Sequence, residues 1–342
     1  MGGSRRSFDP TPVAILARDR AARPEPIILL APCQRSGSHY LEALLALHPA
    51  CRKSLIPEDF FLANSATLIN FCRSLTESWE PDWCLDDRAG DTARLAAGFG
   101  AVLLQFVDPV APEVAPPDDC RLLLRTPAGD GIEAAATLFP NARVVVLARD
   151  GPATVESGRR SFGWRYEMAM RAWRDSVRHI FSVLADGDGE RYHLVRFEDI
   201  FTDPAREIAQ ILDFIGLDRR TYPFDGIGAV PVFGSSTLGR AKGEPVHWRP
   251  VARDQNFDPL NRARSWPRHR LKRFTWLAGP ELKELGYPVQ PLSALDRVWN
   301  VVRDSLHGLG RVGFHIGAFR RRQPRIFSDR RRRYLSWRTL NN

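Results

Sequence analysis

The chain has 342 residues, of which 44% are apolar, a composition that supports a full hydrophobic core and argues against wholesale disorder. It has no run of 18 apolar residues, which excludes a transmembrane helix, and no Cys-x-x-Cys pair or Cys/His cluster with zinc spacing, which argues against a metal site. The formal net charge is +9, and the five cysteines are expected to be free thiols in a cytoplasmic protein.

The first elements are predicted close to the N-terminus. Residues 1–24 are rich in Arg, Pro and Asp and are expected to form a tail. The short apolar run 27–30 predicts a buried parallel strand, and Ser36-Gly37-Ser38 breaks it. Apolar residues then recur at helical spacing from Leu41 to Leu45. The order is therefore strand, tight loop, helix.

Strands and helices continue to alternate through the centre of the chain. Strands are predicted at 121–124, 144–147 and 192–197, and helices at 133–139, 167–184 and from Asp203-Pro204 to Gly216. This alternation predicts an α/β fold with a doubly wound parallel sheet in one domain, residues 25–290. The composition changes at Pro291, so 291–342 are predicted to be a basic C-terminal extension.

The loop after the first strand has the features of an anion site. Its backbone N–H groups and the following helix N-terminus are positively polarised, and Gly37 lets an anion approach the backbone. Ser36 and Ser38 add hydroxyl donors, and Arg35 adds a planar cation. A Ser-Gly-Ser turn also occurs for steric reasons alone. The Gly-Lys-Ser/Thr of nucleoside-triphosphate loops is absent, which disfavours a kinase.

A second candidate anion contact follows the strand 144–147. Arg149 is expected at the carboxyl end of that strand, where ligands gather in open α/β sheets, and Ser157 lies two turns into the next helix. An arginine and a hydroxyl together satisfy a phosphate with charge-assisted hydrogen bonds. The alternative is a surface arginine paired with Asp150.

These two segments resemble the motifs with which sulfotransferases bind 3′-phosphoadenosine 5′-phosphosulfate (PAPS). The bacterial and Golgi branches commonly read Pro-Arg-Ser-Gly-Thr-Thr-Leu, where this chain has Gln34 in place of Pro and His39 in place of the second Thr. The resemblance extends over roughly 27–290 and implies PAPS as co-substrate with no metal. It implies the following PAPS-binding residues: Arg35, Ser36, Gly37, Ser38, His39, Tyr40, Arg149, Ser157, Phe197, Lys242 and Gly243.

The resemblance also implies two catalytic residues. Arg35 matches the position of a catalytic Lys or Arg, and since arginine does not deprotonate in proteins, its expected role is electrostatic. Glu58 lies in a segment that resembles a Pro-Glu-x-x-Phe region, which makes it the candidate general base. The alternative is an exposed loop carboxylate.

The acceptor is not specified by these motifs. A hydroxyl or amine on a carbohydrate, lipid or small molecule is expected, selected by loops in residues 50–120 and 218–270. Two alternative functions are a catalytically inactive nucleotide- or glycan-binding protein of the same fold and a P-loop kinase. No specific nucleic acid is expected as a partner.

The extension 291–342 holds 12 of the 49 basic residues and three of the 40 acidic ones, so the rest of the chain is formally neutral. Its apolar residues, among them Val302, Leu306 and Ile316, recur near helical spacing. One interpretation is that the extension binds an anionic membrane surface or an acidic partner, which would make the protein peripheral at a membrane. The other, slightly favoured by the sequence, is that these apolar residues pack on the catalytic domain.

Overall fold

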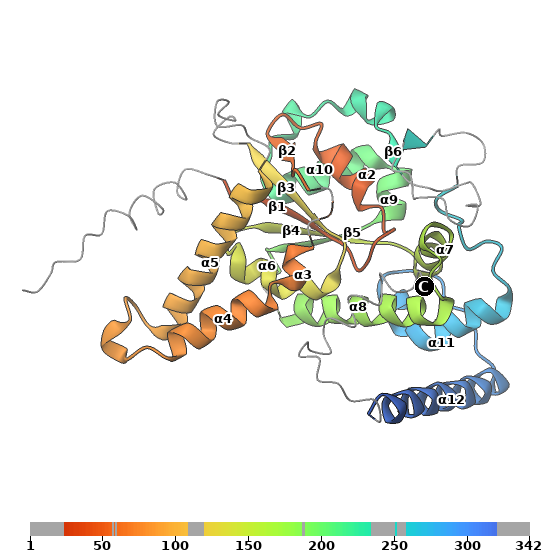
Figure 1. Ribbon diagram of the computed structural model, residues 1–342. Coiled ribbons are helices and arrows are strands. Elements are labelled where there is room, and N and C mark those ends of the chain that lie inside the picture. Colours follow the sequence, from red (N-terminus) through yellow and green to blue (C-terminus); the bar gives the residue numbers. More distant parts are fainter. Residues whose placement is uncertain are drawn as a thin grey trace, which may run out of the picture.

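The computed structural model describes residues 24–56, 58, 60–108, 120–186, 189–233, 250–251 and 258–319. Its centre is a sheet of five parallel strands in the order β2-β3-β1-β4-β5 (Figure 1). The strands are β1 (Ile27–Leu30), β2 (Cys51–Lys53), β3 (Arg121–Thr126), β4 (Arg143–Ala148) and β5 (Tyr192–Arg196). The fold is therefore α/β with a parallel sheet, as the alternation of elements predicted.

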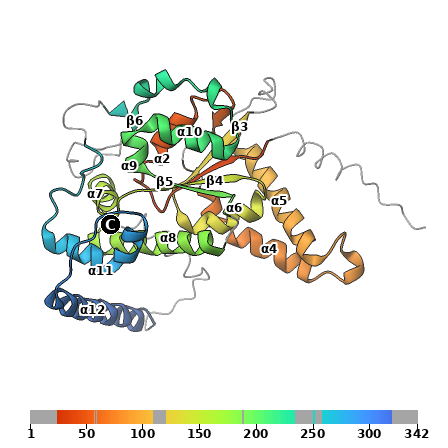
Figure 2. The same ribbon diagram turned by 180° about the vertical axis from the view of Figure 1, so that it is seen from behind.

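The central strands β1 and β4 are almost wholly apolar because both faces of the sheet are covered there. Alternate residues of β1 and β4 enter two separate clusters, with Leu29 and Val145 in one and Leu30 and Val144 in the other. Helices α2 (Ser38–Leu45), α9 (Phe197–Thr202) and α10 (Pro204–Ile215) cover the first face, and α3 (Phe61–Asn64), α5 (Arg88–Val107) and α6 (Ile132–Leu138) cover the second (Figures 1 and 2).

A third cluster lies beyond the carboxyl ends of the strands. It joins α7 (Gly151–Phe162), α8 (Tyr166–Asp186) and α11 (Arg268–Glu284) around Trp164, Trp173 and Phe274. Trp173 and Phe274 meet edge to face, with ring centroids 5.4 Å apart. This cluster fixes the helix that follows β4, and so fixes one wall of the space above the sheet edge.

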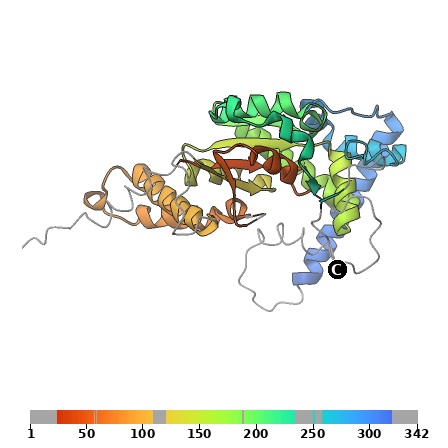
Figure 3. The ribbon, with the colours of Figure 1, turned by 90° about the horizontal axis from the view of Figure 1, so that it is seen from above.

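The remaining elements complete the fold. They are α4 (Ala66–Glu77), α12 (Ala294–Phe319), a two-stranded antiparallel ladder of β6 (Val232–Phe233) with β7 (Pro250–Val251), and four short 3₁₀ turns at Pro81–Trp83, Gly129–Gly131, Arg219–Thr221 and Phe224–Ala229. Helices α4 and α5 pack side by side and project from the sheet (Figure 3). The segment 61–107 is thus largely helical, whereas the sequence analysis treated 50–120 as loops.

The strand order places a topological switch between β1 and β4. After β1 the chain passes toward β2 on one side, and after β4 it passes to β5 on the other. Ligands of open α/β sheets bind in the crevice at such a point. The two loops that border this crevice are those that contain Arg35 and Arg149.

Candidate functional site

The loop from β1 to α2 is held in a conformation that depends on glycine. Gly37 has a φ of 98°, and a Cβ atom there would lie 2.2 Å from Cδ2 of Phe197, so any side chain would collide with that ring. Arg35 also lies in the left-handed region, with a φ of 69°. The Ser36 hydroxyl donates to the Cys33 carbonyl at 2.8 Å. Ser36 therefore stabilises the loop with its side chain.

Arg149 comes directly after β4 and is 5% exposed, so the alternative of a surface arginine is wrong. Its guanidinium donates to the Arg35 carbonyl at 2.6 Å and to the Pro259 carbonyl, and lies 4.5 Å from the centre of the Phe197 ring. Its Nε has no hydrogen-bond partner among the described residues. A buried cation with an uncommitted donor is a fitting contact for an anion.

The carboxylates behind Arg149 hold the start of α7. Asp150 accepts from the backbone N–H of Ala153 at 2.9 Å, which caps that helix. Glu198 accepts from the backbone N–H of Asp150 at 3.1 Å and from the Tyr287 hydroxyl at 2.6 Å. Burial raises the pKa of Asp150 to about 6, with the nearby charge of Glu198 adding to the effect. Arg149 is thus placed by a rigid strand end and by a capped helix.

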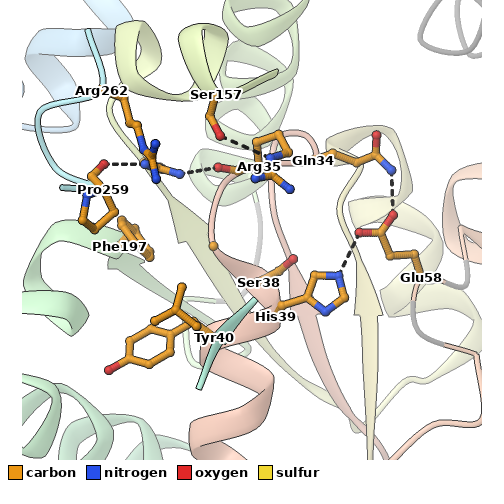
Figure 4. A pocket seen from close by; sticks show the side chains of 13 residues that line it. Gln34, Arg35, Ser38, His39, Tyr40, Glu58, Ser157, Phe197, Pro259 and Arg262 are labelled. Carbon is orange, nitrogen blue, oxygen red and sulfur yellow. Dashed lines mark hydrogen bonds and ion pairs between the residues drawn. The ribbon is translucent and has the colours of Figure 1, made fainter. Parts of the chain in front are cut away.

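Arg35 and Ser157, which were predicted separately, contact each other. The Arg35 Nε donates to the Ser157 hydroxyl oxygen at 3.2 Å, across the crevice between the β1–α2 loop and α7 (Figure 4). The guanidinium of Arg35 also lies 5.7 Å from the centre of the Phe162 ring. One of the five N–H donors of Arg35 makes the bond to Ser157, and the side chain faces the pocket.

A third arginine, Arg262, lines the same pocket and is 8% exposed. Burial together with repulsion from Arg149 lowers the pKa of Arg35 and of Arg262 from 12.5 to about 10. Burial lowers the pKa of Arg149 as well. All three stay protonated at neutral pH, so the site concentrates positive charge that an anion would stabilise.

Glu58 lies on the wall of the pocket opposite Arg262 (Figure 4). One of its carboxylate oxygens accepts from the Gln34 amide at 2.6 Å, and the other lies 3.2 Å from an Arg125 nitrogen and 3.5 Å from His39 Nε2. Burial raises the pKa of Glu58, but the contacts with His39, Arg125 and Gln34 outweigh it and lower the pKa overall. The side chain is 16% exposed, so the alternative of an exposed loop carboxylate is wrong.

Arg125 links Glu58 to the helix that follows the loop. It sits in β3 with its side chain fully buried, and its Nε lies 3.2 Å from Glu42 of α2. A buried cation between two carboxylates is compensated on both sides, and it fixes the position of each. The structure thus attaches the candidate base to the sheet.

The pocket encloses about 610 Å³, part of it open to solvent. Its lining residues are Gln34, Arg35, Gly37, Ser38, His39, Tyr40, Glu58, Arg149, Ser157, Phe197, Val232, Pro259 and Arg262. Ser36 is buried beneath the loop and is not in the lining. Lys242 and Gly243 lie outside the described residues. In the part of the chain that the structure describes, no cluster of three or more His, Cys, Asp or Glu side chains is arranged to hold a metal ion.

Four lining residues were missed by the sequence analysis: Gln34, Val232, Pro259 and Arg262. Gln34 was visible as a departure within the first motif, but no pattern gave it a role. Arg262 stands in an irregular stretch between Asp258 and Trp266 that matches no motif quoted above. The sequence marks Arg262 only as one arginine in a segment rich in arginines.

Comparison with known proteins gives one family. Residues 26–221 match a family model described as the sulfotransferase family. Among solved structures, the chain is similar to a sulfotransferase domain from the curacin biosynthetic pathway (16% identity, TM-score 0.47, 78% of this chain and 100% of that one) and to one from the Synechococcus PCC 7002 olefin synthase (21%, 0.49, 78% and 97%). It is also similar to mouse sulfotransferase SULT7A1 complexed with PAP (12%, 0.44, 83% and 92%). No curated protein matches the chain.

Proposed function

The chain belongs to the sulfotransferase family, and from this premise we propose that it transfers a sulfuryl group from PAPS to a hydroxyl or amine of an acceptor. The observation that carries the proposal is the meeting of Arg35, Arg149 and Arg262 at the switch point of the sheet. Among the described residues around this pocket, Glu58 is the one carboxylate. The excess of cations suits a ligand with several negative charges.

The residues present fit PAPS, which carries a 3′-phosphate and a 5′-phosphosulfate. Arg149, with its unpartnered buried Nε, and the Ser157 hydroxyl are suited to the 3′-phosphate. The backbone around Gly37 and the start of α2, where no side chain caps the helix, is suited to the 5′ group. When bound, PAPS supplies a sulfuryl group on a phosphate that leaves without needing much protonation.

Arg35 acts in this proposal as a fixed positive charge. A pKa of about 10 leaves it protonated at neutral pH, so it does not donate a proton as a general acid. In a transfer that spreads negative charge over oxygen atoms, a preorganised guanidinium stabilises the transition state more than the ground state. Its hydrogen bond to Ser157 restrains the side chain before substrate arrives.

Glu58 acts as the general base. Its lowered pKa keeps the carboxylate ionised at neutral pH, ready to accept the proton that an acceptor hydroxyl or amine loses as its oxygen or nitrogen bonds to sulfur. Arg125 and Gln34 hold the carboxylate in place, since each donates to a different one of its two oxygens. The acceptor becomes strongly acidic only as its oxygen or nitrogen bonds to sulfur. A weak base held in the right place is therefore sufficient to accept the proton.

The test is to supply purified protein with ³⁵S-labelled PAPS and a metabolite and lipid extract from cells that lack the protein. We expect a labelled product together with adenosine 3′,5′-bisphosphate, both absent without the protein. Tight binding of adenosine 3′,5′-bisphosphate in calorimetry with no labelled product in any extract would instead support the inactive binding protein. Transfer of the γ-phosphate of labelled ATP would support a kinase.

A further inference from the structure

Helix α12 packs on the catalytic domain with its polar face. Asn300 is 4% exposed and accepts from Arg273 of α11 at 2.8 Å. Asp304 accepts from the Trp276 indole at 2.8 Å and also from Arg273, and Asp296 pairs with Lys272 at 2.5 Å. These three residues of α12 are spaced four apart, so they lie on one face of the helix.

The opposite face of α12 is apolar and points away from the domain. Leu295, Val298, Trp299, Val302 and Leu306 lie on it at helical spacing and are between 45% and 82% exposed. Figures 1 and 2 show the helix outermost, beyond α11. The expectation that Val302 and Leu306 pack on the domain is therefore wrong. An amphipathic helix normally turns its apolar stripe to the core, so this orientation leaves a surface that needs a partner.

We propose that α12 lies in the interface of an anionic membrane, with this apolar stripe among the lipids. The stripe runs from Leu295 to Leu306, about 17 Å along the helix, so its side chains can lie together against a flat surface. No helix in the described part of the chain is long and apolar enough to cross a bilayer, so the contact is with the surface. This inference does not depend on the proposed reaction.

Charge decides between a membrane and a second copy of the chain. The extension 291–342 has 12 basic residues and three acidic ones, and two of those acids, Asp296 and Asp304, face the domain in ion pairs. The outward face of the helix is therefore apolar, and the extension to which it belongs has an excess of basic residues. Anionic headgroups complement that excess, whereas two copies of the helix face to face would bring like charges together.

The strength of binding depends on both components. Each arginine near an anionic surface increases partitioning about fivefold, and a tryptophan or leucine buried in the interface about tenfold or more. Binding should therefore fall as salt rises, while the apolar part persists.

The experiment uses the full chain in co-sedimentation with vesicles of phosphatidylcholine that contain phosphatidylglycerol, and with vesicles of phosphatidylcholine alone. The test variant is Trp299→Ser with Leu306→Ser. The matched control is Trp83→Ser, because Trp83 is 64% exposed on a turn between α4 and α5 and Trp299 is 68% exposed. Since these side chains are exposed, melting temperatures should stay within a few degrees of the parent's, which shows that each variant folds.

We expect the parent and Trp83→Ser to bind the anionic vesicles, and the α12 variant to bind at least tenfold more weakly. Absence of parent binding at low salt would overturn the proposal, as would equal binding by the α12 variant. A third outcome is that the parent does not bind vesicles, is a dimer by light scattering, and becomes a monomer when the α12 substitutions are made. That outcome would assign the stripe to a second copy of the chain. Equal binding to both vesicle types would overturn the requirement for anionic lipid.

Discussion

Replacement of Arg149 by alanine is expected to weaken the binding of adenosine 3′,5′-bisphosphate. In the structure two donors of this guanidinium serve the carbonyls of Arg35 and Pro259, and Nε has no partner among the described residues. The uncommitted donor and the charge are what a phosphate would use. Loss of a charge-assisted contact costs about 1.5–3 kcal/mol, which corresponds to a dissociation constant about 10- to 150-fold larger.

The same change should also lower the stability of the unliganded protein. The carbonyls of Arg35 and Pro259 lose their donor, and a buried carbonyl without a partner costs about 1–3 kcal/mol. Relief of the repulsion among the three arginines, and of the cost of burying the Arg149 charge, acts in the other direction and offsets part of this loss. We expect a melting temperature lower by several degrees.

Isothermal titration calorimetry of the parent and of Arg149→Ala at a temperature well below both melting points measures the first effect. Arg196→Ala is the control, because Arg196 ends the neighbouring strand β5 but is paired with Asp199 at 2.7 and 2.8 Å and does not line the pocket. Arg149→Lys keeps the charge and should lose less affinity. Equal affinity of parent and Arg149→Ala would refute the assignment, and equal weakening by Arg196→Ala would show that the loss is not specific to the pocket.

Four further results are expected. Arg35→Ala should abolish transfer with the fold intact by circular dichroism, and Glu58→Gln should lower kcat while calorimetry finds nucleotide binding little changed; full turnover in Glu58→Gln would place the base elsewhere. Burial raises the pKa of Asp304, but the contacts with Arg273, Trp276 and Arg171 outweigh it and lower the pKa from 3.8 to about 2. Asp304 therefore stabilises the protein above pH 4 and loses that effect as the pH falls through 2, so Asp304→Asn should lower the melting temperature by an amount that corresponds to about 1 kcal/mol at pH 7 and by little at pH 2 and below. A double change of Gln34 and His39 should move the acid limb of the pH–rate profile upward.

Much of the fold followed from short-range patterns. The run Val144–Leu147 is apolar on both faces, and only a strand covered on both sides accommodates such a run. Gly216 ends α10 in the left-handed conformation, as its position after the apolar stripe predicted. Helices α4 and α5 were taken for loops, although both contribute to the second cluster through Cys72, Ala96 and Val107, and α5 packs on α6 as well as on α4.

The site was predicted where it depends on local geometry and missed where it depends on distant segments. Arg149 follows a strand and Gly37 starts a helix, so their positions could be read from the chain. Arg262 arrives from far along the sequence in an irregular stretch, and no periodic signal marks such a residue. Ser36 and Ser38 were predicted to have the same role, yet the Ser36 hydroxyl donates to the Cys33 carbonyl, because only the three-dimensional loop decides which hydroxyl faces the pocket.

Two of the departures from the family motif, Gln34 and His39, meet at the same carboxylate. Gln34 donates to one oxygen of Glu58 at 2.6 Å, and His39 lies 3.5 Å from the other. The resemblance predicts that His39 replaces a threonine in holding phosphate, and the histidine lines the pocket; its position beside Glu58 also suits it to stabilise the ionised base. Both contacts favour the charged form, so their loss in Gln34→Leu with His39→Thr should raise the pKa of Glu58.

Because transfer requires the ionised carboxylate, the acid limb of kcat against pH should then lie at higher pH, while kcat on the plateau changes less. In the Glu58→Gln background no carboxylate titrates at this position, so this limb should be absent with or without the double change, which separates an action through Glu58 from an action on phosphate. A double variant whose limb stays in place but whose affinity for adenosine 3′,5′-bisphosphate falls would return His39 to the phosphate. The two results are distinguishable, since an action on Glu58 changes the position of the acid limb and an action on phosphate changes the affinity for adenosine 3′,5′-bisphosphate.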